Sequence, residues 1–331
     1  MIFCALLILG FVPTQSAIAP TAPQTLPPIK VVAGNDVVAD LVRAIAGPDV
    51  DLFVLGQAGG DPHHYEPTPA DAKKIESADL VIEFGLGLDR AMGKLHRSTG
   101  SKAPLLVVAE GLGKGSDAAV ADHDAHADHD AHADHDAHAD HDAHADHDAH
   151  ADHAGVDPHI WHDPSKVRVL NERICAVLVA VRPTCAETFR SRSLELDAQL
   201  VKLDEWIKSQ VLRIPESKRL LVTTHDGLRS FGDRYGLRVV GIEMTADGSD
   251  VAPSQLVKMV NALRETKSPV VFGDAAHPSR IAATVAREAN VRLVETLRLD
   301  SLLHSPNAEH GKAYLETMRS NVNMIVEALH E

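Results

Sequence analysis

The sequence predicts two α/β lobes, each with a parallel four-stranded sheet flanked by helices, joined by one long rigid helix. Short apolar runs alternate with helical segments along the chain, and four of these runs precede and four follow residues 184–212. Apolar strands that alternate with helices are typical of parallel sheets covered on both faces. With 331 residues, 44% of them hydrophobic, the chain is long enough to form two domains.

The expected strands are short runs of apolar, often β-branched residues that end in polar or turn residues. Helix-start chemistry lies between them. Thr68 can cap a helix whose first residue is Pro69, and Pro164 and Pro253 open two more helices. In chain order, the expected strands are Ile29–Ala33, Val50–Leu55, Asp79–Phe84, Pro104–Ala109, Arg219–Thr224, Leu237–Glu243, Pro269–Gly273 and Val291–Leu297.

One amphipathic helix is expected over Thr184–Leu212, because no Gly or Pro interrupts it and charged residues occupy the face opposite its apolar residues. We therefore expect a first lobe over residues 29–182, a connecting helix over 183–212 and a second lobe over 213–331. A continuous helix is stiff, so it limits how far the lobes can move apart. Its apolar positions are Phe189, Leu196, Leu200, Leu203, Ile207 and Val211.

The N-terminus has the features of a signal peptide over residues 1–19. An apolar run is followed by Ala-Ile-Ala at 17–19, an A-x-A cleavage signature, and the run is too short to anchor the chain across a bilayer. No Lys or Arg precedes the run, and Pro20 would follow the cut, so a start codon placed too late and a different cleavage position are alternatives. We expect an exported protein in the periplasm. Because Cys4 lies so near the start, we expect no lipid anchor.

Removal of this segment leaves two cysteines, Cys175 and Cys185. In an oxidising compartment, an even pair of cysteines ten residues apart favours a disulfide. Two separate reduced thiols are the alternative. Zinc binding by the pair is less favoured, because the spacing is far from Cys-x-x-Cys.

Residues 121–150 repeat the hexapeptide Ala-Asp-His-Asp-Ala-His five times. Short His-rich tracts typically bind metal, and imidazole suits zinc in particular. Alanine is the largest apolar side chain in the tract, so we expect residues 116–155 to stay disordered. A solvated acidic linker is the alternative. The histidines, at every third position, are His123, His126, His129, His132, His135, His138, His141, His144, His147, His150 and His153.

Most of the net charge of −15 comes from the eleven aspartates of residues 121–153, which include no Lys or Arg. Nothing strongly basic is left to suggest a nucleic-acid partner or an anionic membrane surface. The charge therefore indicates no nucleic-acid function.

Three further histidines follow expected strands. His63 and His159 both occur in Asp-Pro-His, and His225 follows the strand that ends at Thr224. Ligands of open parallel sheets bind beyond the carboxyl ends of the strands, so these side chains are candidate metal ligands. A structural hydrogen-bonding role is the alternative for any one of them.

At these motifs the chain resembles the metal-specific solute-binding proteins of bacterial ABC importers for zinc and manganese. The resemblance runs from about residue 29 to 331. It rests on Asp-Pro-His-His-Tyr-Glu-Pro-Thr-Pro (61–69), Ala-Asp-Leu-Val-Ile (78–82), Asp-Pro-His-Ile-Trp (157–161), Thr-His-Asp-Gly (224–227) and Arg-Tyr-Gly-Leu (234–237). It implies two lobes bridged by a rigid helix, one metal in the cleft between them, and a His-rich insertion before the second ligand motif.

The resemblance also implies four ligands. Three are His63, His159 and His225, and the fourth is a carboxylate shortly after the last strand, which matches Asp300. The rivals for that fourth position are Asp274 and His277. His64 and His162 neighbour ligands and are expected to face solvent or to support the ligands from behind.

Three imidazoles and one carboxylate form a closed tetrahedral set that suits Zn²⁺, whereas manganese favours more oxygen ligands. We therefore expect a monomeric zinc receptor that delivers to an ABC permease and its ATPase, with the repeat collecting zinc and a periplasmic chaperone as a possible further partner. A zinc buffer or metallochaperone and a manganese receptor are the alternatives. A zinc hydrolase is disfavoured, because no His-Glu-x-x-His or Gly-x-Ser-x-Gly motif occurs.

Overall fold

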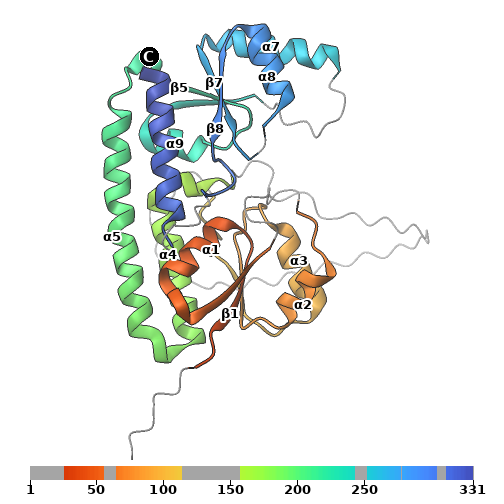
Figure 1. Ribbon diagram of the computed structural model, residues 1–331, viewed down its shortest axis with the longest axis vertical. Helices are drawn as coiled ribbons and strands as arrows, with labels where there is room; N and C mark the ends of the chain where they lie inside the picture. The colour runs from red at the N-terminus through yellow and green to blue at the C-terminus, as the bar shows by residue number, and fades with distance from the viewer. Residues whose placement is uncertain are drawn as a thin grey trace, which may run out of the picture.

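The computed structural model describes residues 26–55, 65–113, 157–242, 252–276, 278–303 and 311–330. The predicted signal peptide, His63, His64, His277 and the His-rich repeat lie outside these residues. Two α/β lobes lie one above the other, and helix α5 (Ala186–Val211) runs along one side of both (Figure 1). The predicted fold class is confirmed.

The first lobe is built on a parallel sheet in the order β2-β1-β3-β4. Every predicted strand of this lobe forms, some of them shortened at an end. The strands are β1 (Ile29–Ala33), β2 (Val50–Val54), β3 (Leu80–Glu83) and β4 (Leu105–Val107), and the helices are α1 (Asp36–Ala46), α2 (Pro69–Glu76), α3 (Arg90–Thr99) and α4 (Pro164–Val181).

The second lobe repeats this topology, with a parallel sheet in the order β6-β5-β7-β8. In both sheets the loops that follow the strands therefore begin at the carboxyl edge of the sheet. The strands are β5 (Leu220–Thr223), β6 (Arg238–Gly241), β7 (Val270–Asp274) and β8 (Arg292–Leu297), and the helices are α6 (Arg229–Tyr235), α7 (Pro253–Thr266), α8 (Arg280–Ala289) and α9 (Ala313–His330).

The helix starts follow the predicted chemistry. Thr68 caps α2 in a capping box with Asp71, and Pro69 is the first helical residue. Asp163 caps α4 ahead of Pro164, accepting a hydrogen bond from the Ser165 N–H at 2.9 Å. These caps fix where each helix leaves its loop.

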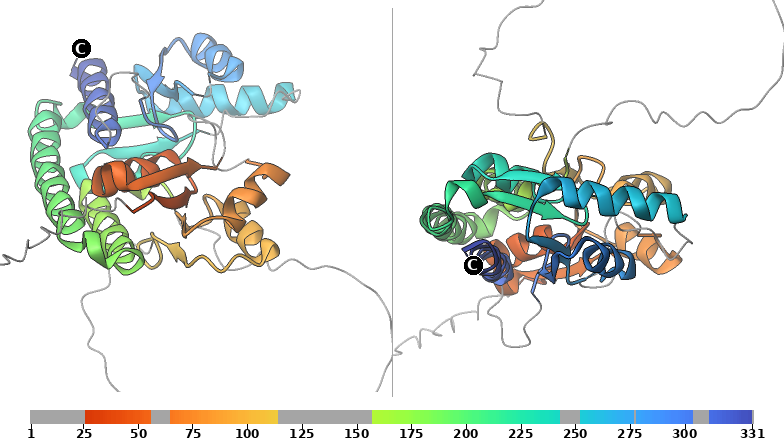
Figure 2. Two further views of the ribbon diagram at one scale, coloured as in Figure 1. Left: turned by 60° about the horizontal axis from the view of Figure 1, so that its bottom comes forward. Right: turned by 90° about the horizontal axis from the view of Figure 1, so that it is seen from above.

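Alternating residues of the strands face two different cores. In β1, Val31 and Ala33 belong to a central core, whereas Val32 packs under α2 and α3 with Ile75 and Met92. In the second lobe the outer face of the sheet packs under α7 and α8 in the same way. Each sheet is thus covered on both faces, as the views in Figure 2 show.

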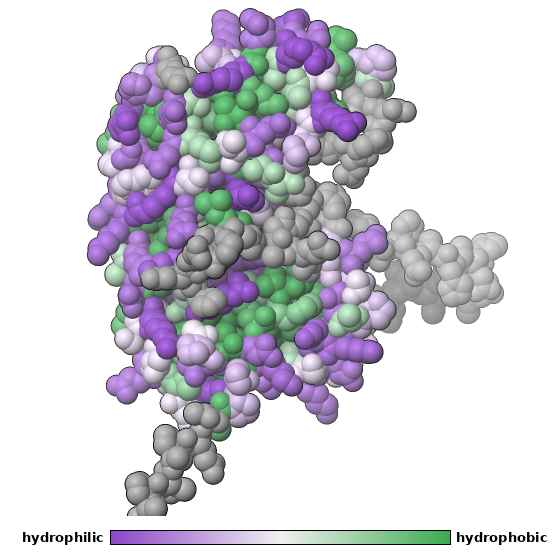
Figure 3. Space-filling model, viewed as in Figure 1, coloured by the Kyte–Doolittle hydropathy of each residue, from purple (hydrophilic) through white to green (hydrophobic). Residues whose placement is uncertain are grey.

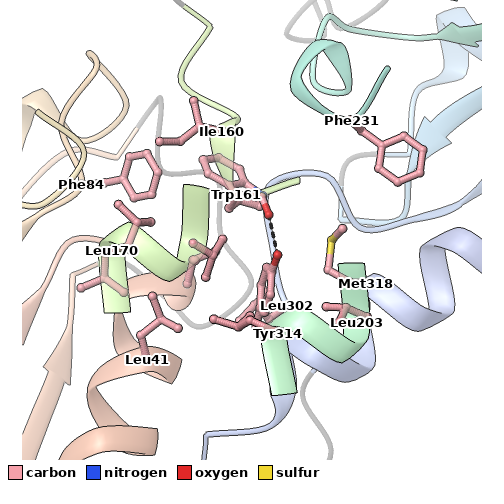
Figure 4. Packing of buried hydrophobic residues seen from close by; sticks show 14 of the residues in the cluster. Leu41, Phe84, Ile160, Trp161, Leu170, Leu203, Phe231, Leu302, Tyr314 and Met318 are labelled. Carbon is pink, nitrogen blue, oxygen red and sulfur yellow. Dashed lines mark hydrogen bonds between the residues drawn. The ribbon is translucent and has the colours of Figure 1, made fainter. Parts of the chain in front are cut away.

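The central core is continuous across the two lobes. It includes Leu41 and Phe84 of the first lobe, Phe231 and Met318 of the second, and Trp161 beside them (Figure 4). On the face shown in Figure 3, hydrophilic side chains rim both lobes around smaller apolar areas. None of the described helices has the length and apolar character needed to span a lipid bilayer.

Helix α5 matches the predicted connecting helix closely. A short 3₁₀ turn (Pro183–Cys185) precedes it, and all six predicted apolar positions are buried. Two polar residues, Ser193 and Asp204, are buried on the same face. Asp204 accepts hydrogen bonds from the Arg234 guanidinium and the Tyr235 hydroxyl, which tie the helix to α6 of the second lobe.

The predicted disulfide is wrong, because Cys175 and Cys185 are free thiols in the structure. Cys175 lies within α4, and that helix continues to Val181 before the chain turns. Cys185 lies at the end of the 3₁₀ turn that follows this helix, and its side chain is only partly buried.

Candidate metal centre

Three potential metal ligands meet where the two lobes face each other. His159 comes from the first lobe, and His225 and Asp300 come from the second. One donor atom from each residue lies within 4.8 Å of the others. His159 Nε2 is 3.0 Å from Asp300 Oδ1, and His225 Nε2 is 3.3 Å from Asp300 Oδ2. Two imidazole nitrogens thus face the two oxygens of one carboxylate.

His159 is oriented by Asp157, two residues earlier. Asp157 Oδ1 accepts hydrogen bonds from the His159 backbone N–H at 2.9 Å and from its ring Nδ1 at 2.8 Å. Because Nδ1 carries the donated proton, Nε2 of the neutral ring holds a lone pair directed at the cluster. A carboxylate behind a ligating histidine is the usual support of a metal-bound imidazole. Sequence reasoning missed this role, although Asp-Pro-His contains the carboxylate.

His225 follows the end of β5, and the chain around it leaves room only for glycine at position 227. A Cβ at Gly227 would lie 2.7 Å from His225 Nε2. The Gly227 N–H also donates to the His225 carbonyl at 2.9 Å, closing a tight turn. The glycine of the Thr-His-Asp-Gly motif therefore keeps the ring nitrogen unobstructed.

Asp300 lies three residues beyond β8, and its side chain is only 7% exposed. Its rival, Asp274, is buried at the end of β7, where Oδ1 accepts a hydrogen bond from the Ala276 N–H at 2.9 Å. Among the residues that the structure describes, Asp274 is not part of the donor cluster. The other rival, His277, lies outside the described residues, as does the predicted ligand His63.

Of the two alternatives expected for His162, a solvent-facing position is wrong, because the side chain is buried. Its Nε2 donates to the Leu299 carbonyl at 3.0 Å. Burial lowers the pKa of His162 to about 4, so the ring is neutral at physiological pH. Its hydrogen bond holds the residue that precedes Asp300.

The ligand cluster carries protons that a divalent cation would replace. Burial acts to lower the pKa of His159, but its hydrogen bonds to Asp157 and Asp300 outweigh burial and raise the pKa to about 9. Burial also opposes the shift of His225, and the neighbouring Asp300 carboxylate raises its pKa. Positive charge is therefore stabilised at the same point by the same anions, whether protons or a metal supply it.

Two α/β lobes facing each other across a largely buried set of imidazole and carboxylate donors define a metal-binding solute receptor. Residues 31–328 match the model of the family described as "Zinc-uptake complex component A periplasmic". The chain belongs to this family, whose members are metal-binding, substrate-binding proteins of ABC importers and not enzymes.

Relatives of known function are similar over nearly the whole chain. The "Manganese ABC transporter substrate-binding lipoprotein PsaA" of Streptococcus anginosus is 27% identical over 301 residues, which cover 91% of this chain and 89% of the relative. The "Manganese-binding lipoprotein MntA" of Halalkalibacterium halodurans is 27% identical over 304 residues, with 92% and 89% coverage. The zinc-binding protein TroA of Treponema pallidum shares the fold, with a TM-score of 0.73 at 23% identity, covering 92% of this chain and all of that one.

These relatives contradict one prediction. Both relatives matched by sequence are named lipoproteins, which overturns the expectation of an exported protein without a lipid anchor. That expectation used only the number of residues that precede Cys4, and this count is a poor measure of how a chain is attached to a membrane.

Proposed function

We propose that this protein captures zinc outside the cytoplasmic membrane and delivers it to the permease and ATPase of an ABC importer. The observation that supports this best is the cluster that His159, His225 and Asp300 form between the lobes, where His159 is buried and the other two are partly buried. Family membership supports the role in an ABC importer, and the types of ligand in the cluster support zinc as the metal.

The proposed ligand set is completed by His63. This residue follows β2, and β2 is a neighbour of β1 in the sheet of the first lobe. The carboxyl ends of parallel strands meet at one edge of a sheet, and β2 ends there at Val54, nine residues before His63. Three imidazoles with Asp300 as the fourth ligand make the closed N₃O set that zinc prefers in sites without a catalytic position.

Manganese is the second candidate, because relatives of this chain are named for it. Manganese prefers oxygen-rich sites, and among the described residues the cluster offers two nitrogens and a single carboxylate. Competition for binding alone cannot identify the cargo, since zinc binds more tightly than manganese to most sites of this kind.

Measurements of uptake into cells therefore test which metal the protein delivers. Cells that lack this gene should lose high-affinity uptake of radioactive zinc and keep uptake of radioactive manganese. Uptake should return with the wild-type protein and stay lost with His225→Ala, which removes a nitrogen donor. Loss of manganese uptake alone would contradict the zinc assignment and favour the manganese receptor.

We also propose that the repeat within residues 116–155 collects zinc for the buried site. Eleven histidines in an acidic tract can bind several ions weakly, and none of the four proposed ligands lies in that tract. Protein with 116–155 deleted should keep one tight zinc site by equilibrium dialysis and lose the weaker ones. If the deletion abolished tight binding, the primary ligands would have been misassigned.

A buffer or metallochaperone remains the competing function without a transporter. Deleting the permease gene separates the two. If the protein acts only through the importer, losing both genes should limit growth in a zinc chelator no further than losing the permease alone. An added defect in the double deletion would indicate a separate buffering role.

A further inference from the structure

The loop that carries Asp300 is held within its own lobe by helix α9. Asn321 brackets Arg298, accepting from its backbone N–H at 3.0 Å and donating to its carbonyl at 2.8 Å. The Leu303 N–H donates to Thr317 Oγ1 at 2.8 Å. Both ends of the loop are therefore fixed by the second lobe, and its middle faces the first lobe.

The first lobe holds the middle of that loop at one atom. The Leu299 carbonyl oxygen accepts hydrogen bonds from Trp161 Nε1 at 3.1 Å and from His162 Nε2 at 3.0 Å. Both donors are buried. A carbonyl can only accept, so His162 Nε2 must carry the proton. Two lone pairs of one oxygen are thus used by two adjacent side chains of the other lobe.

These two side chains come two and three residues after the ligand His159, and the carbonyl they hold directly precedes the ligand Asp300. Residues 159–162 therefore supply one donor atom and also locate the donor from the opposite lobe. The resulting separation of His159 Nε2 and Asp300 Oδ1 is 3.0 Å. A displacement of this loop would directly change the distance between His159 Nε2 and Asp300 Oδ1.

Trp161 has little freedom to turn away. Its ring packs edge-on against Phe84 and His159, with ring centres 5.2 Å and 5.1 Å apart. Its carbonyl accepts a hydrogen bond from the buried Tyr314 hydroxyl at 2.8 Å, drawn as the dashed line in Figure 4. The Tyr314 N–H in turn donates to Asp40 of α1 at 2.9 Å. Polar groups in such a dry setting bond strongly and are costly to leave unpaired.

We propose that Trp161 and His162 are positioning residues that dock the Asp300 loop across the lobe interface, so that the donor set is assembled before metal arrives. This inference rests on the proposed function, since it assumes that the cluster is the metal site. Neither side chain needs to touch the metal. Their effect on affinity comes from holding the Leu299 carbonyl.

A pair of substitutions at His162 tests the donor itself. Glutamine places an amide nitrogen the same number of bonds from Cβ as histidine Nε2, so His162→Gln can keep the hydrogen bond. His162→Leu fills similar space without a donor, and Trp161→Phe keeps an aromatic ring without the indole N–H. Asn171→Leu is the matched control, because Asn171 Nδ2 makes a buried hydrogen bond to the Ser193 carbonyl at 3.0 Å, between α4 and α5.

Zinc affinity of the full-length protein is measured by competition with a chromophoric chelator, and the coordination is followed by the visible spectrum of bound Co²⁺. Changes behind metal ligands typically weaken binding about 10–100-fold. We expect His162→Leu and Trp161→Phe each to weaken tight zinc binding at least about tenfold and to change the Co²⁺ spectrum. We expect His162→Gln to remain within about threefold of the wild type, the effect of a weakened hydrogen bond.

The control separates positioning from general destabilisation. Asn171→Leu should lower the unfolding midpoint and leave both the affinity and the Co²⁺ spectrum unchanged. The inference is overturned if His162→Leu binds zinc like the wild type, if His162→Gln loses as much affinity as His162→Leu, or if Asn171→Leu loses as much affinity. A wild-type protein without a tight site would instead refute the proposed function.

Discussion

Zinc capture by this protein should release protons at neutral pH, because the metal-free site holds them. The pKa of His159 is raised to about 9, since its bonds to Asp157 and Asp300 outweigh the opposing effect of burial. The pKa of His225 is raised as well by Asp300. Zinc binds only the unprotonated nitrogen, so each bound zinc should displace at least about one proton at pH 7.

The direction of the pH dependence follows from this competition. Below its raised pKa, His159 must lose a proton to bind metal, and each pH unit below that value costs a factor of about ten in affinity, or about 1.4 kcal/mol. At pH 7, which is about two units below a pKa of about 9, the penalty is about 2.7 kcal/mol. Affinity should therefore rise about a hundredfold between pH 6 and pH 8 from His159 alone.

Calorimetry in buffers with different heats of protonation measures the protons released per zinc directly. The repeat should be deleted for this measurement, so that only the buried site is titrated. Asp157→Asn provides the control: without the carboxylate the pKa of His159 should fall, and fewer protons should be released at pH 7. Affinity that stays flat from pH 6 to 8, with no buffer-dependent heat, would refute the assignment of a proton to His159.

Three further outcomes are expected. His159→Ala and His225→Ala should each weaken zinc binding severely, whereas Asp300→Ala should weaken it less because water can occupy the vacated position; chelator competition gives the order. Gly227→Ala should lower affinity at least about tenfold with little change in the unfolding midpoint, since its Cβ would displace the His225 ring. Burial and the nearby Asp89 raise the pKa of Glu83 to about 7, so its charge destabilises the folded protein at pH 8. Glu83→Gln should therefore increase the free energy of unfolding by about 1 kcal/mol at pH 8, after allowance for the partial exposure of Glu83, and by almost nothing at pH 4.5. Urea titrations at the two pH values measure this difference.

Local patterns in the sequence were sufficient for most of the fold. The strands were predictable because short runs of β-branched residues bounded by turn residues seldom form any other structure in an α/β chain. The connecting helix was predictable because its apolar spacing is regular from Phe189 to Val211 without a helix breaker. The position of His225 also follows from order along the chain, since it comes two residues after the parallel strand β5, whereas His159 comes 52 residues after β4 and is indicated by its Asp-Pro-His motif.

Contacts between distant residues were not predictable in this way. The hydrogen bond from His162 to the Leu299 carbonyl joins residues 137 positions apart, and the bond from Tyr314 to Asp40 joins residues 274 apart. Neither residue type nor spacing indicates such partners, because packing of the two lobes decides them. His162 could therefore not be assigned to the interior.

The way the lobes share a core limits how the site can open. Trp161 is 3% exposed and Tyr314 is 1% exposed, and both lie in the central core that runs through the two lobes. Fully exposing one such aromatic side chain, about 150–250 Å² at about 25 cal/mol per Å², costs about 4–6 kcal/mol. Separating the lobes here would expose both rings and break the bonds to the Leu299 carbonyl. The loop that carries His225 makes none of these contacts, so its displacement is the cheaper route by which a metal could enter or leave.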